Sequence, residues 1–235
     1  MRIGVASGLL GLAFVFAPMT SALAGTPYTA KAVCPVDDKT FEYTGTGSYS
    51  TFGSYLDGMP QASWTMPMPL PQCPDSRFPV YRDDFSDADK EKIRALVTTP
   101  EYGAVRDEAS YYLFWFVLTR LEPPREGLDG PWPLLQATWQ VRGDPQRYAG
   151  YVGEVIPLVE AALPEVKAEA PGDWWYYQVV LANLERQSGD FVAATARLDG
   201  LEGAPPAVGD LSQRLTLTRQ MIAQQDRSAA APPRN

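Results

Sequence analysis

Two cysteines are the residues of this chain whose type and spacing could carry chemistry. Cys34 and Cys73 each open a Cys-Pro dipeptide, and the sequence contains no other cysteine. Asp37 and Ser76 stand three residues after them, where a zinc knuckle would carry its second cysteine. A metal site would need Cys34, Asp37, Cys73 and one further ligand. Structural zinc prefers four sulfur or nitrogen ligands and the chain has no histidine, so the residues disfavour zinc.

The amino terminus indicates the compartment in which these thiols would work. Arg2 precedes an apolar run from Ile3 to Phe16, and a small-residue segment ending in Ala22-Leu23-Ala24 follows. This is the pattern of a secretory signal with an A-x-A cleavage site, so residues 1–24 are predicted to be removed. An uncleaved anchor is the alternative, but the run is shorter than the roughly 20 residues of a membrane span. We therefore expect a periplasmic or secreted protein with no membrane span after signal removal.

The predicted compartment is oxidising, and this determines the expected state of the two cysteines. Thiols there tend to pair, and two cysteines allow a single pairing, so Cys34 and Cys73 are predicted to form a disulfide. It would close a loop of about 40 residues and stabilise the fold by about 4 kcal/mol in the chain-entropy account. Met59, Met66 and Met68 could bind copper(I) through their thioethers, but methionines beside prolines more often cover apolar surface. No metal and no cofactor is predicted.

The residues around the two cysteines also carry a resemblance. The first group comprises Cys34, Pro35, Val36, Lys39 and Phe41, and the second comprises Cys73, Pro74, Phe78, Tyr81, Asp84 and Phe85. Over residues 33–85 the chain resembles an uncharacterised family of bacterial proteins in which a CPxC-type zinc-ribbon module precedes tetratricopeptide-like helices. It departs from the pattern at Asp37 and Ser76, which replace the second cysteine of each knuckle. The resemblance implies a ribbon fold for this segment and no known activity.

Residues 25–84 are predicted to form a small β-rich, ribbon-like module. The segment is rich in glycine, proline and serine, and Phe41 and Tyr43 alternate with polar residues as in a half-buried strand. Residues 66–73, "MPMPLPQC", have proline at every second position, which indicates an extended segment and not a central strand.

Residues 85–225 are predicted to be helical. Ser86 with Asp89 indicates a capped helix start, and Thr99-Pro100 begins a second helix that we expect to run on to Pro123. "RGDPQ" and "QSGDF" each separate a further pair of helices, a last helix covers about 211–224, and residues 226–235 are predicted to be disordered. The predicted fold is mostly α: a tetratricopeptide-like antiparallel helix array with an N-terminal β-rich, disulfide-closed ribbon module.

Residues 175–208 are the best local match to a repeat. They resemble one tetratricopeptide unit through Leu181, Ala182, Gly189, Phe191, Ala194, Leu198 and Pro206. Glu185 stands where an aromatic residue is usual. A single unit cannot bury its apolar face alone, so neighbouring helices are expected on both sides.

The sequence offers no catalytic motif, and no catalytic residue is predicted. Without histidine there is no Ser-His or Cys-His nucleophile, and neither a Walker loop nor a G-x-G-x-x-G motif occurs. A pair of carboxylates is the remaining enzymatic option, but the acidic cluster of residues 83–89 lies where a helix begins, a place acids favour. Trp174, Trp175 and Tyr177 form a candidate binding surface that could stack on sugars, with packing between helices as the alternative.

The net charge of the chain bears on which classes of binding partner are expected. The net charge of −8 without a basic stripe argues against nucleic acid and against anionic lipid surfaces. We therefore expect a non-enzymatic interaction or scaffold protein of the cell envelope, whose partner is an envelope protein or peptide. The alternative is a glycan-directed binder or a carboxylate-dependent glycan hydrolase.

The signal pattern makes a direct prediction. Amino-terminal sequencing of the protein from fractionated cells should read Gly25 as the first residue, in material from outside the cytoplasm. Recovery of Met1 from the cytoplasm would contradict the predicted export.

Overall fold

The computed structural model describes residues 25–203, 205–207 and 209–233. The predicted signal peptide, residues 1–24, lies outside this range, and so do the last two residues of the predicted tail.

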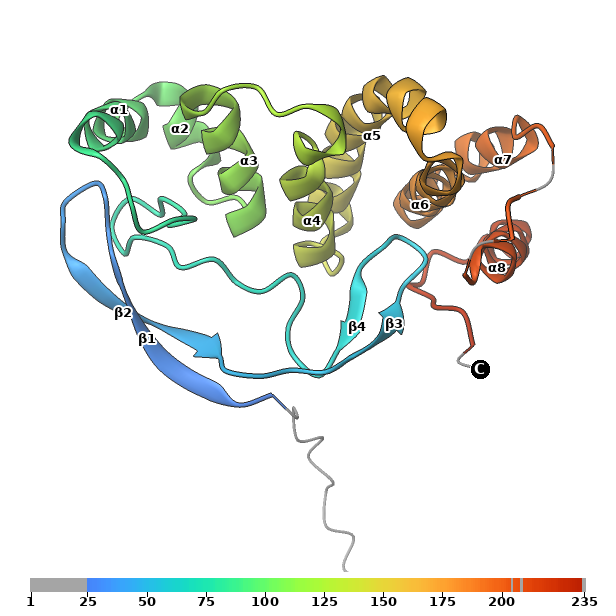
Figure 1. The fold of residues 1–235 in the computed structure, drawn as a ribbon, viewed down its shortest axis with the longest axis horizontal. Helices are drawn as coiled ribbons and strands as arrows, with labels where there is room; N and C mark the ends of the chain where they lie inside the picture. The colour runs from blue at the N-terminus through green and yellow to red at the C-terminus, as the bar shows by residue number, and fades with distance from the viewer. Residues whose placement is uncertain (1–24, 204, 208, 234–235) are drawn as a thin grey trace, which may run out of the picture.

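The described chain is mostly α, as predicted. Its helices stand side by side in a row that runs from α1 at one end to α7 and α8 at the other (Figure 1). Their bounds are α1 Asp87–Val97, α2 Pro100–Val105, α3 Ser110–Leu121, α4 Trp132–Gln140, α5 Pro145–Glu169, α6 Pro171–Ser188, α7 Phe191–Asp199 and α8 Leu211–Ala223, with a short 3-10 helix, η1, at Gly127–Asp129.

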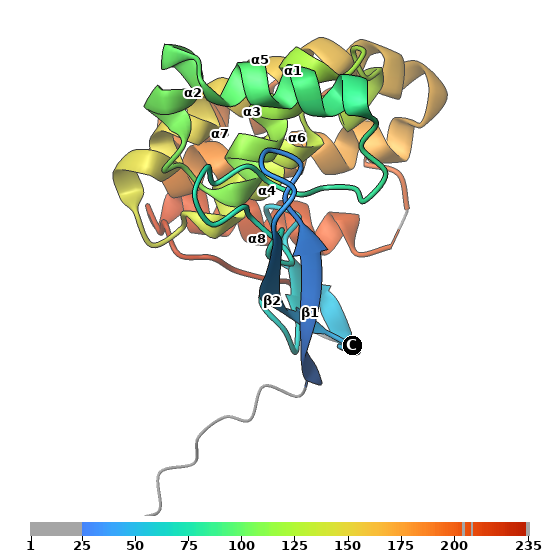
Figure 2. The ribbon, with the colours of Figure 1, turned by 90° about the vertical axis from the view of Figure 1, so that its left-hand side faces the viewer.

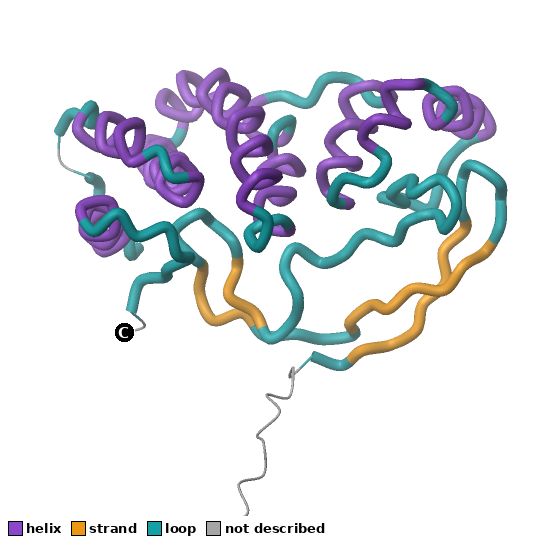
Figure 3. The backbone as a smooth tube through the Cα atoms, turned by 180° about the vertical axis from the view of Figure 1, so that it is seen from behind, coloured by secondary structure: helices purple, strands orange, loops and turns teal. Residues whose placement is uncertain are grey.

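Residues 25–84, here called the strap, extend along one side of this row. They contain two antiparallel hairpins, formed by β1 (Pro27–Val33) with β2 (Thr40–Thr46), and by β3 (Thr51–Ser54) with β4 (Pro60–Ala62). The first hairpin lies toward the α1 end and the second toward α6 and α8 (Figures 1 and 3). Seen from the end of the row, β1 and β2 reach well beyond the helices (Figure 2). The strand predicted around Phe41 and Tyr43 is β2.

Local signals explain several helix boundaries. Ser86 accepts a hydrogen bond from the Asp89 amide, and the Asp89 carboxylate accepts one from the Ser86 amide, so the predicted capping box starts α1. The Thr99 hydroxyl caps α2 by accepting a hydrogen bond from the Tyr102 amide at 3.2 Å. Gly189, with φ of 98°, ends α6 in the left-handed conformation that glycine adopts without strain.

One helix prediction was wrong, because residues 100–121 form two helices and not one. The chain becomes extended at Ala109, whose amide donates to the hydroxyl of Tyr151 on α5 at 3.1 Å. This tertiary hydrogen bond replaces the bond that a continuous helix would have made, and it lets α3 start in a new direction.

The predicted disulfide is confirmed: Cys34 and Cys73 are bonded, with their Cα atoms 5.3 Å apart. Each cysteine opens a turn of the same kind. The Cys34 amide donates to the Lys39 carbonyl and the Cys73 amide to the Phe78 carbonyl, both at 2.9 Å. The fifth residue of each turn, Asp38 or Arg77, has a φ near 60° (58° and 62°).

Asp37 and Ser76 also occupy equivalent places in the two turns. The Asp37 carboxylate accepts a hydrogen bond from the Lys39 amide at 3.2 Å, and the Ser76 hydroxyl accepts one from the Phe78 amide at 3.4 Å. Both residues therefore stabilise their turns as hydrogen-bond acceptors. Within the described residues, no three His, Cys, Asp or Glu side chains lie close enough to hold a metal ion.

The strap and the helices share one core at the disulfide end. Phe78 of the strap packs with the disulfide against Ile93 of α1 and Leu113 of α3. The predicted boundary between residues 84 and 85 falls in the loop before α1, and this core includes residues from both sides of it.

Further along the row, a buried carboxylate ties the strap to α4 and α6. Asp57, in the β3–β4 turn, has no exposure to solvent. It forms an ion pair with Arg142 after α4 and accepts a hydrogen bond from Gln187 of α6 at 3.0 Å. The indole of Trp139 donates to the Asp57 carbonyl at 3.3 Å.

The segment after α8 does not match its prediction, because residues 226–230 are bound to the rest of the fold. Arg227 donates to the carbonyls of Gln187 and Ser188, each at 3.0 Å, and the Leu56 amide donates to the Ala230 carbonyl at 2.7 Å. These bonds satisfy the carbonyls at the end of α6 and an amide of the strap, which is why a polar, alanine-rich sequence becomes ordered here.

The pair α6–α7 contains the close contact that small residues were expected to allow. Ala182 and Ala194 are fully buried in one cluster, and α8 packs on both helices. Glu185 forms an ion pair with Arg197 of α7 at 2.6 Å, which accounts for an acid at a position where an aromatic was expected.

The disulfide should contribute measurably to stability. Replacing Cys34 and Cys73 together by serine should lower the free energy of unfolding by about 4 kcal/mol, because the loop of about 40 residues is released in the unfolded chain. Urea denaturation with and without reductant measures this, and the double variant should not respond to reductant. An unchanged midpoint for the reduced natural protein would contradict the prediction.

The Asp57 contact gives a second stability prediction. Asp57→Ala should cost about 3–5 kcal/mol in thermal or urea unfolding, because it leaves the Arg142 guanidinium without its partner. Glu42→Ala is the matched control: the exposed Glu42–Lys31 pair has a 3.9 Å separation, and its loss should cost less than about 1 kcal/mol. Equal effects of the two substitutions would show that Asp57 is not an anchor.

Candidate functional site

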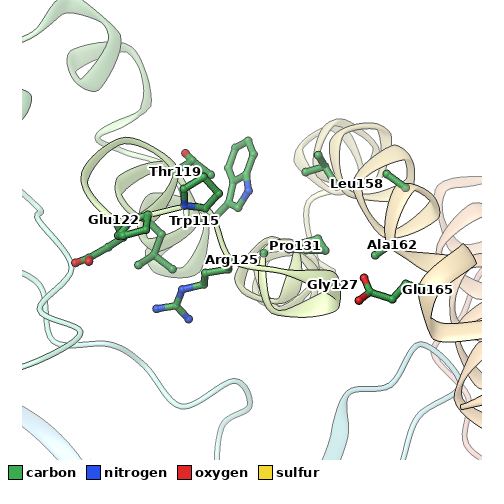
Figure 4. A pocket seen from close by; sticks show the side chains of 14 residues that line it. Trp115, Thr119, Glu122, Arg125, Gly127, Pro131, Leu158, Ala162 and Glu165 are labelled. Atoms are coloured by element: carbon green, nitrogen blue, oxygen red, sulfur yellow. The ribbon is translucent and has the colours of Figure 1, made fainter. Parts of the chain in front are cut away.

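A mostly apolar hollow on the described surface lies between α3 and α5, and we call it the α3–α5 groove. Its volume is about 430 Å³. Trp115 and Thr119 of α3 form one wall, Leu158 and Ala162 of α5 form the other, and the loop 123–131 forms the floor (Figure 4).

The sequence builds this groove from a helix stop and an uncovered helix face. Pro123-Pro124 follows α3 and turns the chain across the gap, where Gly127 takes a left-handed φ of 53°. On α5, residues 158, 161, 162 and 165 have the spacing i, i+3, i+4, i+7 and share one face of the helix. That face is apolar at its first three positions, yet Leu158 remains 39% exposed.

Three charged residues border the groove, and they differ in whether other side chains already bind them. Glu122 accepts hydrogen bonds from the Tyr81 hydroxyl at 2.7 Å and from Arg82 at 3.3 Å, and its carboxylate points away from the groove (Figure 4). Arg125 and Glu165 are exposed and form no ion pair with any other described residue. Glu165 therefore presents a free negative charge beside the apolar wall.

A second hollow of similar size, the Glu108–Glu154 cleft, lies between the start of α5 and the chain before α3. Its tyrosines, Tyr112 and Tyr151, are stacked with ring centroids 4.6 Å apart. The Tyr151 hydroxyl donates to Glu108 at 2.5 Å, and the Tyr112 hydroxyl donates to Glu154 at 3.1 Å. Burial and the Glu154 carboxylate raise the pKa of Tyr112 to about 12, so this phenol remains a donor.

The predicted binding surface of Trp174, Trp175 and Tyr177 is not one platform. Trp175 is only 7% exposed and packs against Val179 and Leu211. Tyr177 is half-buried against the central core, and burial raises its pKa to about 12. Trp174 alone lines a surface hollow, with the Lys167 ammonium 4.4 Å from its ring centroid. Trp175 follows Trp174 directly and points about 100° around α6 from it, which turns the Trp175 ring toward Val179 and Leu211.

Sequence reasoning missed the residues of the α3–α5 groove. The core stripe of α5 was visible as Tyr148, Val152, Val155 and Val159, and all four are buried. The groove face is a second apolar stripe displaced around the same helix. A helix with two apolar stripes has more apolar surface than one neighbour can cover, and that signal was present in the sequence.

The chain was compared with protein-family models, curated proteins and solved structures. None of the three comparisons gave a match. Among the described residues, no helix has both the length and the apolar character that crossing a bilayer requires. Function is therefore inferred from the surface itself.

Proposed function

We propose that the protein is a non-enzymatic interaction protein of the cell envelope, periplasmic or secreted, that binds a segment of a partner protein in the α3–α5 groove. The disulfide supports the compartment, because such bonds persist in oxidising surroundings. The signal pattern of residues 1–24 supports it independently.

The observation that carries the proposal is the uncovered apolar face of α5 opposite Trp115. Leu158, Ala161 and Ala162 form a stripe that helical proteins ordinarily bury. Contiguous exposed apolar surface with a polar border is typical of protein interaction sites. Trp115, half-buried in the opposite wall, adds a large rigid ring of the kind that dominates interface energetics.

The charges at the border define the chemistry of the partner segment. Glu165 is free beside the apolar wall and the chain as a whole carries −8, so a basic residue next to apolar ones is favoured. Arg125 lies at the border as well and can donate to backbone carbonyls of the bound segment. The occupant we propose is therefore a short apolar segment with one lysine or arginine.

The Glu108–Glu154 cleft is the site that the glycan-directed alternative would use. It has two carboxylates and two aromatic rings, which is the combination that alternative requires. However, Tyr112 and Tyr151 stack on each other and are 9% and 4% exposed, so neither offers an open face to a sugar. Each carboxylate is also already an acceptor for a tyrosine hydroxyl. These internal contacts favour the protein-binding proposal.

Selection from a displayed peptide library tests the proposal. Selected peptides should combine apolar residues with a lysine or arginine, and Leu158→Glu should weaken their binding by about tenfold or more, as loss of a central apolar contact does. Glu165→Lys should remove the preference for a basic residue.

The matched control for Leu158→Glu is Val192→Glu on α7, where an apolar side chain is 82% exposed outside the groove. It should leave peptide binding unchanged. Peptides that bind Leu158→Glu and the natural protein equally would contradict the groove, and saturable binding to oligosaccharides blocked by Glu154→Gln would favour the glycan alternative.

A further inference from the structure

A small cavity lies beside the Asp57 contact, where four separate segments meet. Its volume is about 170 Å³, and it is lined by Arg142, Pro145, Tyr148, Gln187 and Arg227. These residues come from the chain after α4, the start of α5, the end of α6 and the segment after α8.

Two hydrogen-bonding groups at this cavity have no partner among the described residues. Tyr148 is 3% exposed, and its buried hydroxyl forms no hydrogen bond. The Nε–H of Arg142 is likewise buried and unpaired, although the other end of the guanidinium binds Asp57. Buried polar groups in native proteins almost always have a partner, so an acceptor that is not part of the described chain is indicated.

The charges around Tyr148 show which kind of acceptor fits. The guanidinium groups of Arg142, Arg186 and Arg227 lie near enough to its hydroxyl to influence it electrostatically, and so does the carboxylate of Asp57. That carboxylate is already used by Arg142 and Gln187.

The residues that line the cavity include two arginines, Arg142 and Arg227, and no acidic residue. Burial raises the pKa of the Tyr148 phenol, so the hydroxyl is protonated and available as a donor.

We propose that this cavity binds a small oxyanion, a phosphate or a short carboxylate, through the Arg142 Nε–H, the Tyr148 hydroxyl and Arg227. Charge-assisted hydrogen bonds from arginine to such oxygens are the strong ones. The cavity volume of about 170 Å³ is well below the roughly 300–1,000 Å³ of sites for drug-sized ligands. It therefore suits a small anion and not a nucleotide. The site is separate from the α3–α5 groove and does not depend on it.

The geometry also connects the anion to the end of the chain. Arg227 is held over the cavity by the carbonyls of Gln187 and Ser188 at 3.0 Å, and the Leu56 amide binds Ala230 three residues later. An anion that binds Arg227 would therefore fix the segment after α8 against the strap.

Titration calorimetry and thermal melting of the purified protein, at constant ionic strength in chloride, test the proposal with inorganic phosphate and with acetate as probes. Saturable binding with a raised melting temperature is expected for at least one of them, and the preferred probe identifies the anion. Tyr148→Phe and Arg227→Gln should each weaken binding by about tenfold, the effect of one good hydrogen bond to a charged group.

Two controls separate a ligand site from a structural role. Tyr148→Phe should not lower the melting temperature without anion, because its hydroxyl has no protein partner to lose. Tyr102→Phe, which removes a 3.1 Å bond to the Ser76 carbonyl, should destabilise the protein and leave anion affinity unchanged. No saturable response to either probe, or equal affinity in both cavity variants and the natural protein, would overturn the proposal and leave the cavity to water.

Discussion

The carboxylate of Asp57 has no contact with solvent, and a buried charge is tolerated only where charged and polar partners surround it. Those partners, Arg142 and Gln187, come from the ends of two different helices. The β3–β4 turn that carries Asp57 can therefore lie only where α4 and α6 bring these side chains together. Because the turn is fixed there, the strap is fixed in both position and direction along the row.

The disulfide fixes the other end of the strap, and the two anchors explain how so little β structure stays ordered. A two-stranded hairpin is marginally stable in water, and this protein has two of them that do not pair with each other. At the disulfide end the strap contributes Phe78 to a core completed by α1 and α3. Surface ion pairs from Asp38 to Lys90 and Arg94 add little to this, because exposed pairs are screened by water.

Local chemistry made much of the fold predictable, and tertiary contacts account for what was missed. The capping box at Ser86 and the glycine at the end of α6 follow from residues that are close in sequence. The pairing of the two cysteines follows because the sequence contains no other cysteine. The break at Ala109 depends on a hydroxyl from α5, and the order of residues 226–230 depends on carbonyls of α6. The candidate site was missed for a related reason. Whether this face of α5 is exposed or buried depends on the path of the loop 123–131, and the sequence of α5 does not specify that path.

The strap and the α3–α5 groove lie on different sides of the helix row, since the loop joining α3 to α4 runs along the side away from the strap (Figures 1 and 3). They are nevertheless connected through Glu122, the residue that follows α3. Tyr81 and Arg82, at the end of the strap, hold the Glu122 carboxylate, and Tyr81 also packs against Phe114 of α3 with ring centroids 5.0 Å apart. The α3 wall of the groove is thus supported by the core that contains the disulfide. The disulfide, which is far from the groove in sequence, therefore belongs to the same core that supports one of the groove's walls.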